Sequence, residues 1–239
     1  MLDYLITGDG DWRSYIIHLL LSLPIILIAL CLHETAHGYV AYKLGDPTAR
    51  SLGRLTMNPL KHLDPIGFIC MILFGFGWAN PVPINSRYFK KPRRDMALTA
   101  LAGPVSNLLA ATLFAILYGI AIFGLELFSR KVGFENDTAY LLAQHFLIFL
   151  YYGIALNVTL AVFNLLPVPP LDGSRIVSAF LPPMLAYKYM KYERIISIVL
   201  MVLLLFGVLS PVISIATDLI IDLLMWIPTL FLMLLQYIL

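Results

Sequence analysis

The chain has 239 residues, of which 60% are hydrophobic and only 13% are charged. A typical soluble domain is about 45–50% apolar and about 25% charged, so this composition excludes an ordinary soluble protein, a disordered chain, a secreted disulfide scaffold and a nucleic-acid-binding protein. The formal net charge of +2 indicates no particular electrostatic partner.

Five stretches contain no Asp, Glu, Lys or Arg, and each is long enough, or nearly so, for the roughly 20 apolar residues that span a bilayer. They are residues 14–33, 96–125, 138–171, 195–217 and 223–239. We therefore expect an all-α multi-pass membrane protein with about five to six transmembrane helices, forming a single transmembrane domain over residues 1–239. The expected spans lie at about 14–42, 96–125, 142–166, 192–215 and 219–239.

Basic residues report which side of the membrane each loop occupies, because cytoplasmic loops carry an excess of Lys and Arg. Only Arg13 precedes the first span, whereas the segments 43–95 and 172–194 are rich in Lys and Arg. This alternation predicts that the N-terminus lies outside and that both basic segments are cytoplasmic.

Near its inner end the first span contains His33-Glu34-Thr35-Ala36-His37. Ionisable groups inside a bilayer helix are costly and are functional candidates by default. Residues four apart share one helical face, so the two imidazoles can bind one metal, and Glu34 can reach a water at an open coordination position. The alternative is that the two histidines only cap the inner end of the span.

The apolar run 66–79 is too short to span a bilayer. Its glycines and aromatic residues favour extended structure, so we expect a re-entrant, β-like segment over about 66–86 that packs against the bundle. An extended edge could hold an unwound substrate through Asn80, Val82 and Ile84. The alternative is a loop that dips into the headgroup region.

The second span carries Gly103 and Asn107 on one face, together with other small residues. Small residues let helices approach closely in lipid, so we expect this face to pack on the helix that carries the histidines. Asn107 would then form hydrogen bonds within the core, and a contact with substrate is its second possible role.

The third span ends in three prolines within four residues, which cannot continue a helix. Asp172 follows them at a depth similar to that of His37, which makes it our candidate for a third metal ligand. The alternative for Asp172 is a helix N-cap. Asn164, just before the prolines, could donate a hydrogen bond to a developing oxyanion or could satisfy free carbonyl groups. Asp218 and Asp222 could mark an ion path in the membrane, but we expect them in an outer turn between the last two spans.

The paired motifs around His33-Glu34-x-x-His37 and Asn164…Leu171-Asp172-Gly173 resemble those of the site-2 protease family of intramembrane zinc metalloproteases. Further stretches similar to its compact bacterial and archaeal branch, which lacks PDZ and CBS domains, are 45–50, 53–62, 77–85 and 102–107. The resemblance implies that His33, His37 and Asp172 bind one Zn²⁺ per chain and that Glu34 is the general base. It places Asn164 near the scissile carbonyl, and it also supports a membrane-associated β element.

These inferences predict an intramembrane zinc endopeptidase of the prokaryotic cytoplasmic membrane, with its active site towards the cytoplasm. The expected partners are the lipid bilayer and a membrane-protein substrate with a transmembrane helix, and no nucleic acid. The alternatives are a metal-binding membrane transporter and a catalytically inactive membrane scaffold. A transporter would need more acidic or histidine residues along its spans, and a scaffold would not need Glu34.

Overall fold

The computed structural model describes residues 12–74, 77–131 and 137–238 of the chain. Four long helices dominate it: α2 (Trp12–Lys43), α5 (Pro92–Lys131), α6 (Asp137–Leu165) and α10 (Ser210–Ile238). Each contains at least 28 residues of span-like composition. At about 1.5 Å per residue, such a helix is about 42 Å long and exceeds the roughly 30 Å hydrocarbon core of a bilayer.

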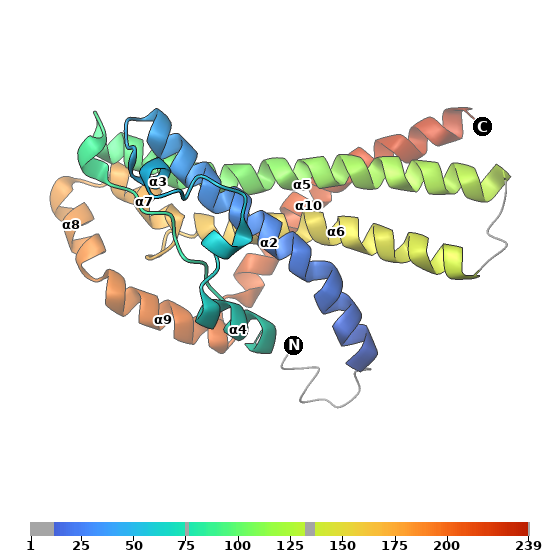
Figure 1. The fold of residues 1–239 in the computed structure, drawn as a ribbon, viewed down its shortest axis with the longest axis horizontal. Coiled ribbons are helices and arrows are strands. Elements are labelled where there is room, and N and C mark those ends of the chain that lie inside the picture. The colour runs from blue at the N-terminus through green and yellow to red at the C-terminus, as the bar shows by residue number, and fades with distance from the viewer. Residues whose placement is uncertain (1–11, 75–76, 132–136, 239) are drawn as a thin grey trace.

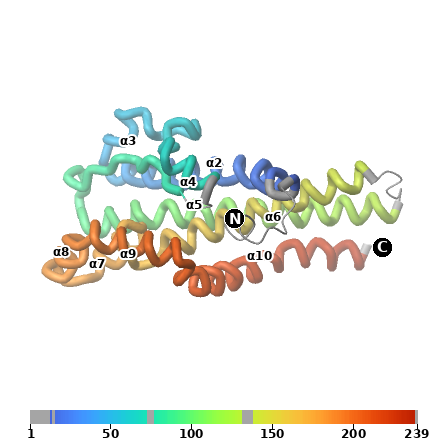
Figure 2. Tube along the Cα trace, turned by 90° about the horizontal axis from the view of Figure 1, so that it is seen from below, coloured from blue at the N-terminus to red at the C-terminus, as the bar shows by residue number. Residues whose placement is uncertain are grey.

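Helix α5 lies at the centre of the bundle, where it packs against α2, α6, α7 and α10. Figure 1 shows α5 and α6 side by side along the long axis, and Figure 2 shows α2 and α10 on opposite sides of this pair. Small and β-branched residues at the contacts allow the helices to approach closely. The buried core they form consists of Ala111, Ala115, Ile154, Val158, Val162 and Ile221.

The shorter elements gather mainly at one end of the bundle, at the left of Figure 1. After α2 come α3 (Thr48–Ser51), the 3-10 turn η1 (Pro59–Lys61), α4 (Pro65–Phe74) and a second 3-10 turn, η2 (Ser86–Tyr88). After α6 come α7 (Asp172–Phe180), α8 (Pro183–Lys191) and α9 (Glu193–Leu205). The α3, α7 and α8 regions therefore bring the two basic segments, 43–95 and 172–194, to the same end.

The C-terminal region differs from the expected pair of spans at 192–215 and 219–239. Helix α9 has 13 residues, about 20 Å, which is too short to cross a bilayer. The chain turns at Gly207, whose φ of +69° suits a glycine after a helix end, and α10 then begins at Ser210. Asp218 and Asp222 lie inside α10, so the expected turn at these residues is wrong; their spacing of four also fits a continuous helix. The structure thus describes four helices of spanning length.

The segment 66–86 also differs from the expectation, because residues 65–74 form helix α4 and not extended structure. Asp64 accepts a hydrogen bond from the backbone N–H of Gly67, and Pro65 occupies the first helical position, which together form an N-terminal cap. Residues 75 and 76 lie outside the described ranges. In the described remainder of the segment, the only ladder contact is an isolated antiparallel bridge between Leu63 and Ala79.

Candidate metal centre

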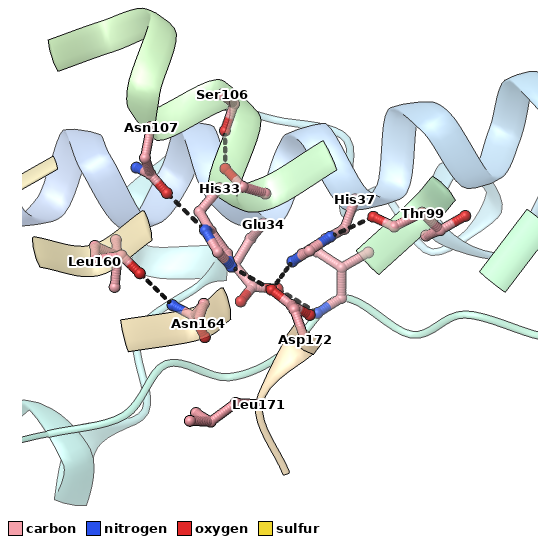
Figure 3. Close-up of polar contacts among 12 residues, drawn as sticks. His33, Glu34, His37, Thr99, Ser106, Asn107, Leu160, Asn164, Leu171 and Asp172 are labelled. Atoms are coloured by element: carbon pink, nitrogen blue, oxygen red, sulfur yellow. Dashed lines mark hydrogen bonds and ion pairs between the residues drawn. The ribbon is translucent and has the colours of Figure 1, made fainter. Parts of the chain in front are cut away.

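Two histidine side chains project from α2 towards the first residue of α7 (Figure 3). His33 and His37 are one helical turn apart, and both are buried. The Nε2 atom of each lies 3.1 Å from the same carboxylate oxygen, Oδ2 of Asp172. Residues 139 and 135 positions apart in the chain are thus brought together at one point.

Asp172 is positioned by the way the chain leaves α6. It is the first residue of α7, Leu171 occupies the N-cap position, and no side chain caps the helix. The N-cap alternative for Asp172 therefore does not describe the structure. A Cβ atom on the next residue, Gly173, would lie 2.2 Å from the carbonyl oxygen of Leu165. Only glycine permits this close return of the chain, which holds Asp172 opposite the histidines.

The outer nitrogens of the two imidazoles face carbonyl oxygens. His33 Nδ1 lies 2.6 Å from Oδ1 of Asn107, and His37 Nδ1 lies 2.7 Å from the backbone oxygen of Thr99. The Asn107 amide is fixed in this orientation, because its Nδ2 donates to the carbonyl of Ala29 and to Oδ1 of Asn157. Each Nδ1 must donate to its acceptor, so each neutral ring presents a lone pair on Nε2.

These donor atoms fit a zinc ion. The three ligand atoms all lie within 4.8 Å of one another, and atoms that bind Zn²⁺ tetrahedrally at about 2.0–2.1 Å are separated by about 3.3 Å. Burial alone would raise the pKa of Asp172, whereas hydrogen bonds and positive charge from His33 and His37, which act when Nε2 of these rings carries a proton, lower it to about 2, so the carboxylate is ionised. With Nδ1 of each ring donating outward, one cation bound to the two Nε2 lone pairs and the carboxylate would replace the protons at this point.

A cavity of about 320 Å³ opens in front of the three ligands. Its walls come from α2, from residues 81–84, from the first turns of α5 and from the end of α6 through α7. Beyond the three ligands, the lining residues are Glu34, Pro81, Val82, Ile84, Met96, Ala100, Asn164, Pro170 and Arg175. The cavity is large enough to admit a short stretch of peptide beside the metal ligands.

Glu34 faces this cavity, and its Oε2 accepts a hydrogen bond of 2.8 Å from the backbone N–H of Val82. Asn164 also lines the cavity, and its Nδ2 donates to the carbonyl of Leu160 in the preceding turn. An amide nitrogen carries two hydrogens, so the other remains available to a ligand. Both of the roles weighed for Asn164 are therefore compatible with its position.

Two residues expected near a substrate are not on the cavity wall. Asn107 is fully buried behind His33, where its Oδ1 faces the imidazole, and it does not line the cavity. Asn80 does not line the cavity either, since its backbone pairs with His62 and Arg54. Val82 and Ile84 do line it, and their role towards a substrate stays a prediction.

Three groups in or next to the site are not identifiable as such from the sequence pattern used above. The acceptor for His37 is a backbone carbonyl, which has no signal in residue type. Asn157 on α6 accepts a hydrogen bond from Asn107. Its sequence signal is a second Asn within an apolar span, because such a residue needs a polar partner there. Arg175, one turn after Asp172, was counted only as a cytoplasmic charge.

Comparisons with known proteins agree with this geometry. The family model described as "Peptidase family M50" matches residues 22–208. Two similar proteins carry the name "Putative zinc metalloprotease". YwhC of Bacillus subtilis is 46% identical over 74% of this chain and 77% of that protein. Rip2 of Mycolicibacterium smegmatis is 31% identical over 71% of this chain and 61% of that protein. "Zinc metalloprotease MJ0392" of Methanocaldococcus jannaschii is 28% identical over 78% of this chain and 42% of that protein. No solved structure matches the chain.

Proposed function

Because this chain belongs to peptidase family M50, the site-2 protease family, and is a membrane zinc metalloprotease, we propose that it hydrolyses peptide bonds within or next to transmembrane segments of other membrane proteins. One observation carries the proposal: the cavity with the three ligands and Glu34 lies between α2, α5 and the end of α6, which are helices of membrane-spanning length and composition. A protease site in that place serves substrates that are themselves in the membrane.

In this proposal His33, His37 and Asp172 hold the zinc ion. When bound there, zinc would supply a Lewis acid that polarises the scissile carbonyl and lowers the pKa of a water molecule. Glu34 accepts the proton of that water and returns it to the leaving amine. Asn164 lines the same cavity and would donate the free hydrogen of its amide to the developing oxyanion.

The segment 80–85 is our candidate for the surface that holds the unwound substrate. The carbonyls of Asn80 and Pro81 accept from Arg54, and the N–H of Asn85 donates to Asp46. Within the described part of the chain, no hydrogen bond engages the backbone N–H or carbonyl of Ile84. In an extended segment, residues two apart have their backbone groups on the same edge. The N–H of Val82 points to Glu34 in the cavity, so Ile84 would offer its groups to a substrate strand at the same edge.

We further propose that the protein lies in the prokaryotic cytoplasmic membrane, with the N-terminus outside and the metal centre towards the cytoplasm. The support is the charge distribution. Both segments that are rich in Lys and Arg, 43–95 and 172–194, flank the end of the bundle where α3, α7 and α8 lie. The N-terminal residues 1–11 of this assignment lie outside the described ranges.

Replacement of Glu34 by Gln tests the proposed activity. Wild type and Glu34→Gln would be reconstituted into liposomes with a fluorescently labelled single-span polypeptide, and the products identified by mass spectrometry. We expect wild type to cut within or beside the span and the variant to lose cleavage while each chain keeps one zinc by elemental analysis. Unchanged cleavage by Glu34→Gln would reject the general-base role. A wild type that cuts only soluble peptides would reject the intramembrane substrate.

A further inference from the structure

A second cavity, of about 590 Å³, lies between the first turns of α5 and helix α7. It shares no lining residue with the cavity of the metal centre. The residues that line it are Lys91, Pro92, Arg93, Arg94, Ala97, Leu98, Leu101, Ile176, Ala179 and Phe180. We refer to it below as the α5–α7 groove.

Two apolar helix faces form the walls of the groove. Ala97, Leu98 and Leu101 lie on one face of α5, at spacings of three and four residues. On α7, Ile176, Ala179 and Phe180 repeat the same spacing. Phe180 is 84% exposed and Leu98 is 43% exposed, so these walls are not covered by the protein itself.

The rim of the groove is positively charged. Lys91, Arg93 and Arg94 line it, and among the described residues no acidic side chain does. Arg93 reaches across to α7, where it donates to the carbonyls of Ser178 and Leu181. The Lys91 side chain is exposed and makes no hydrogen bond or ion pair within the described residues.

Asp95 is the acidic group closest to this rim in the sequence, and it does not cancel the charge. Its side chain is buried, with one oxygen bound to Arg94 and the other to the backbone N–H of Lys91. That pair offsets one of the three positive charges, so the rim keeps a net charge of about +2. Arg94 faces Asp95 through Nε and Nη2 and its side chain is 58% exposed, so its Nη1 can still donate to a ligand. The rim therefore suits an anion.

The positions of charge and apolar wall fit one class of ligand. Arg94 and Leu101 are seven residues apart on α5, about 10 Å along the helix axis. A lipid headgroup and the first part of its acyl chain are separated by a similar distance at the surface of a bilayer. The span-like stretch of α5 also begins here, at Pro92. A soluble phosphate would use only the rim, and an apolar helix would use only the walls. We propose that the α5–α7 groove binds an anionic phospholipid, with its headgroup at Lys91 and Arg94 and an acyl chain along Leu98 and Phe180.

Native mass spectrometry of the purified full-length protein tests this proposal. The probe is an equimolar mixture of phosphatidylglycerol and phosphatidylcholine with identical acyl chains. We expect wild type to retain phosphatidylglycerol in preference. Lys91→Gln with Arg94→Gln should weaken that retention by about fivefold for each charge removed, since a basic residue near the surface contributes on that scale.

A control with the same loss of charge separates the groove from general surface attraction. Lys188→Gln with Arg194→Gln removes two exposed cations that follow α7 in the same basic segment but do not line the groove. This variant should retain phosphatidylglycerol like wild type. Equal retention of both lipids by wild type, or equal losses in the two double variants, would overturn the proposal. So would displacement of the lipid by glycerol phosphate alone at similar concentration, which would indicate a site for a soluble phosphate.

Because Arg94 pairs with Asp95, the double variant could fold poorly. Lys91→Gln alone leaves that pair intact and carries the test in that case, with an expected loss of about fivefold. Zinc content equal to that of wild type shows that each variant is folded. A folded Lys91→Gln that retains phosphatidylglycerol as wild type does would refute a headgroup contact at this residue.

Discussion

The two walls of the metal-centre cavity are built differently. On one wall, His33, His37 and Asp172 come from helices, and buried partners on α5 and α6 fix the imidazoles. On the other wall, residues 80–85 form an irregular segment held at a few backbone atoms by Glu34, Asp46 and Arg54. Helices fix a side chain precisely in space, whereas an extended segment leaves some backbone groups free to pair.

This difference suggests a division of labour. The helical wall should determine whether zinc is bound, and the extended wall should determine whether a peptide is held for cleavage. Glu34 connects the two walls, because it follows His33 on α2 and accepts from Val82. Substitutions on the two walls should therefore have separable effects on zinc content and on cleavage.

Asp172→Ala should have the largest effect, because it removes a ligand from the helical wall. The zinc affinity should fall by more than the roughly 10–100-fold that loss of a supporting residue costs, and cleavage should be lost with it. Elemental analysis of pure protein measures the zinc directly. The matched control is Asp218→Ala, which removes an exposed carboxylate of α10 that does not line the cavity of the metal centre. This variant should keep one zinc per chain. A full zinc content in Asp172→Ala would remove this residue from the ligand set.

Ile84→Pro tests the extended wall. Proline removes the free N–H of residue 84 without changing the helices, so cleavage should be lost while the zinc content stays at one per chain. Ile84→Ala keeps the N–H and loses only the side chain, so it should retain most of the activity. Cleavage of the labelled single-span polypeptide gives the readout. If Ile84→Pro cut as wild type does, the segment would not be the substrate-binding edge.

Gly103→Ala tests how tightly the helical wall is packed. A Cβ at this position would lie 2.5 Å from His37 Nε2 and 2.6 Å from His33 Cε1, so both rings would have to move. We expect a loss of about 10–100-fold in zinc affinity, similar to the removal of a supporting residue. Gly124→Ala on the same helix meets nothing within 4 Å and should bind zinc normally. Equal zinc affinities in the two variants would show that the rings are free to shift.

Much of the helical wall could be predicted from sequence, because helix geometry is regular. The spacing of four put His33 and His37 on one face, and small residues around Gly103 indicated the helix that packs on them. The candidacy of Asp172 followed from its depth after a proline-rich turn. The Thr99 carbonyl could not be anticipated, since every residue has such a carbonyl and only the fold selects one.

The wrong secondary-structure predictions concern segments in which different local sequence signals favour different structures. Aromatic residues and glycines at 66–79 favoured a strand, but Asp64 and Pro65 form a cap that starts helix α4. The pair Asp218 and Asp222 is expected in a turn, although the break in the chain occurs at Gly207. In both cases a capping or turn residue outweighed the composition of the segment.

Asp46→Asn should have the smallest effect and provides the sharpest test of independent walls. Asp46 is fully buried just after the end of α2, where one oxygen accepts from the N–H and the hydroxyl of Thr48 and the other from the N–H of Asn85. An amide offers one oxygen, so one bond is lost, and the extended wall should shift slightly. Cleavage should fall by about tenfold, within the range that a small misplacement costs, at unchanged zinc content. Asp64→Asn, which keeps an oxygen for Gly67, should cut normally. Zinc loss in Asp46→Asn would mean that the two walls are coupled.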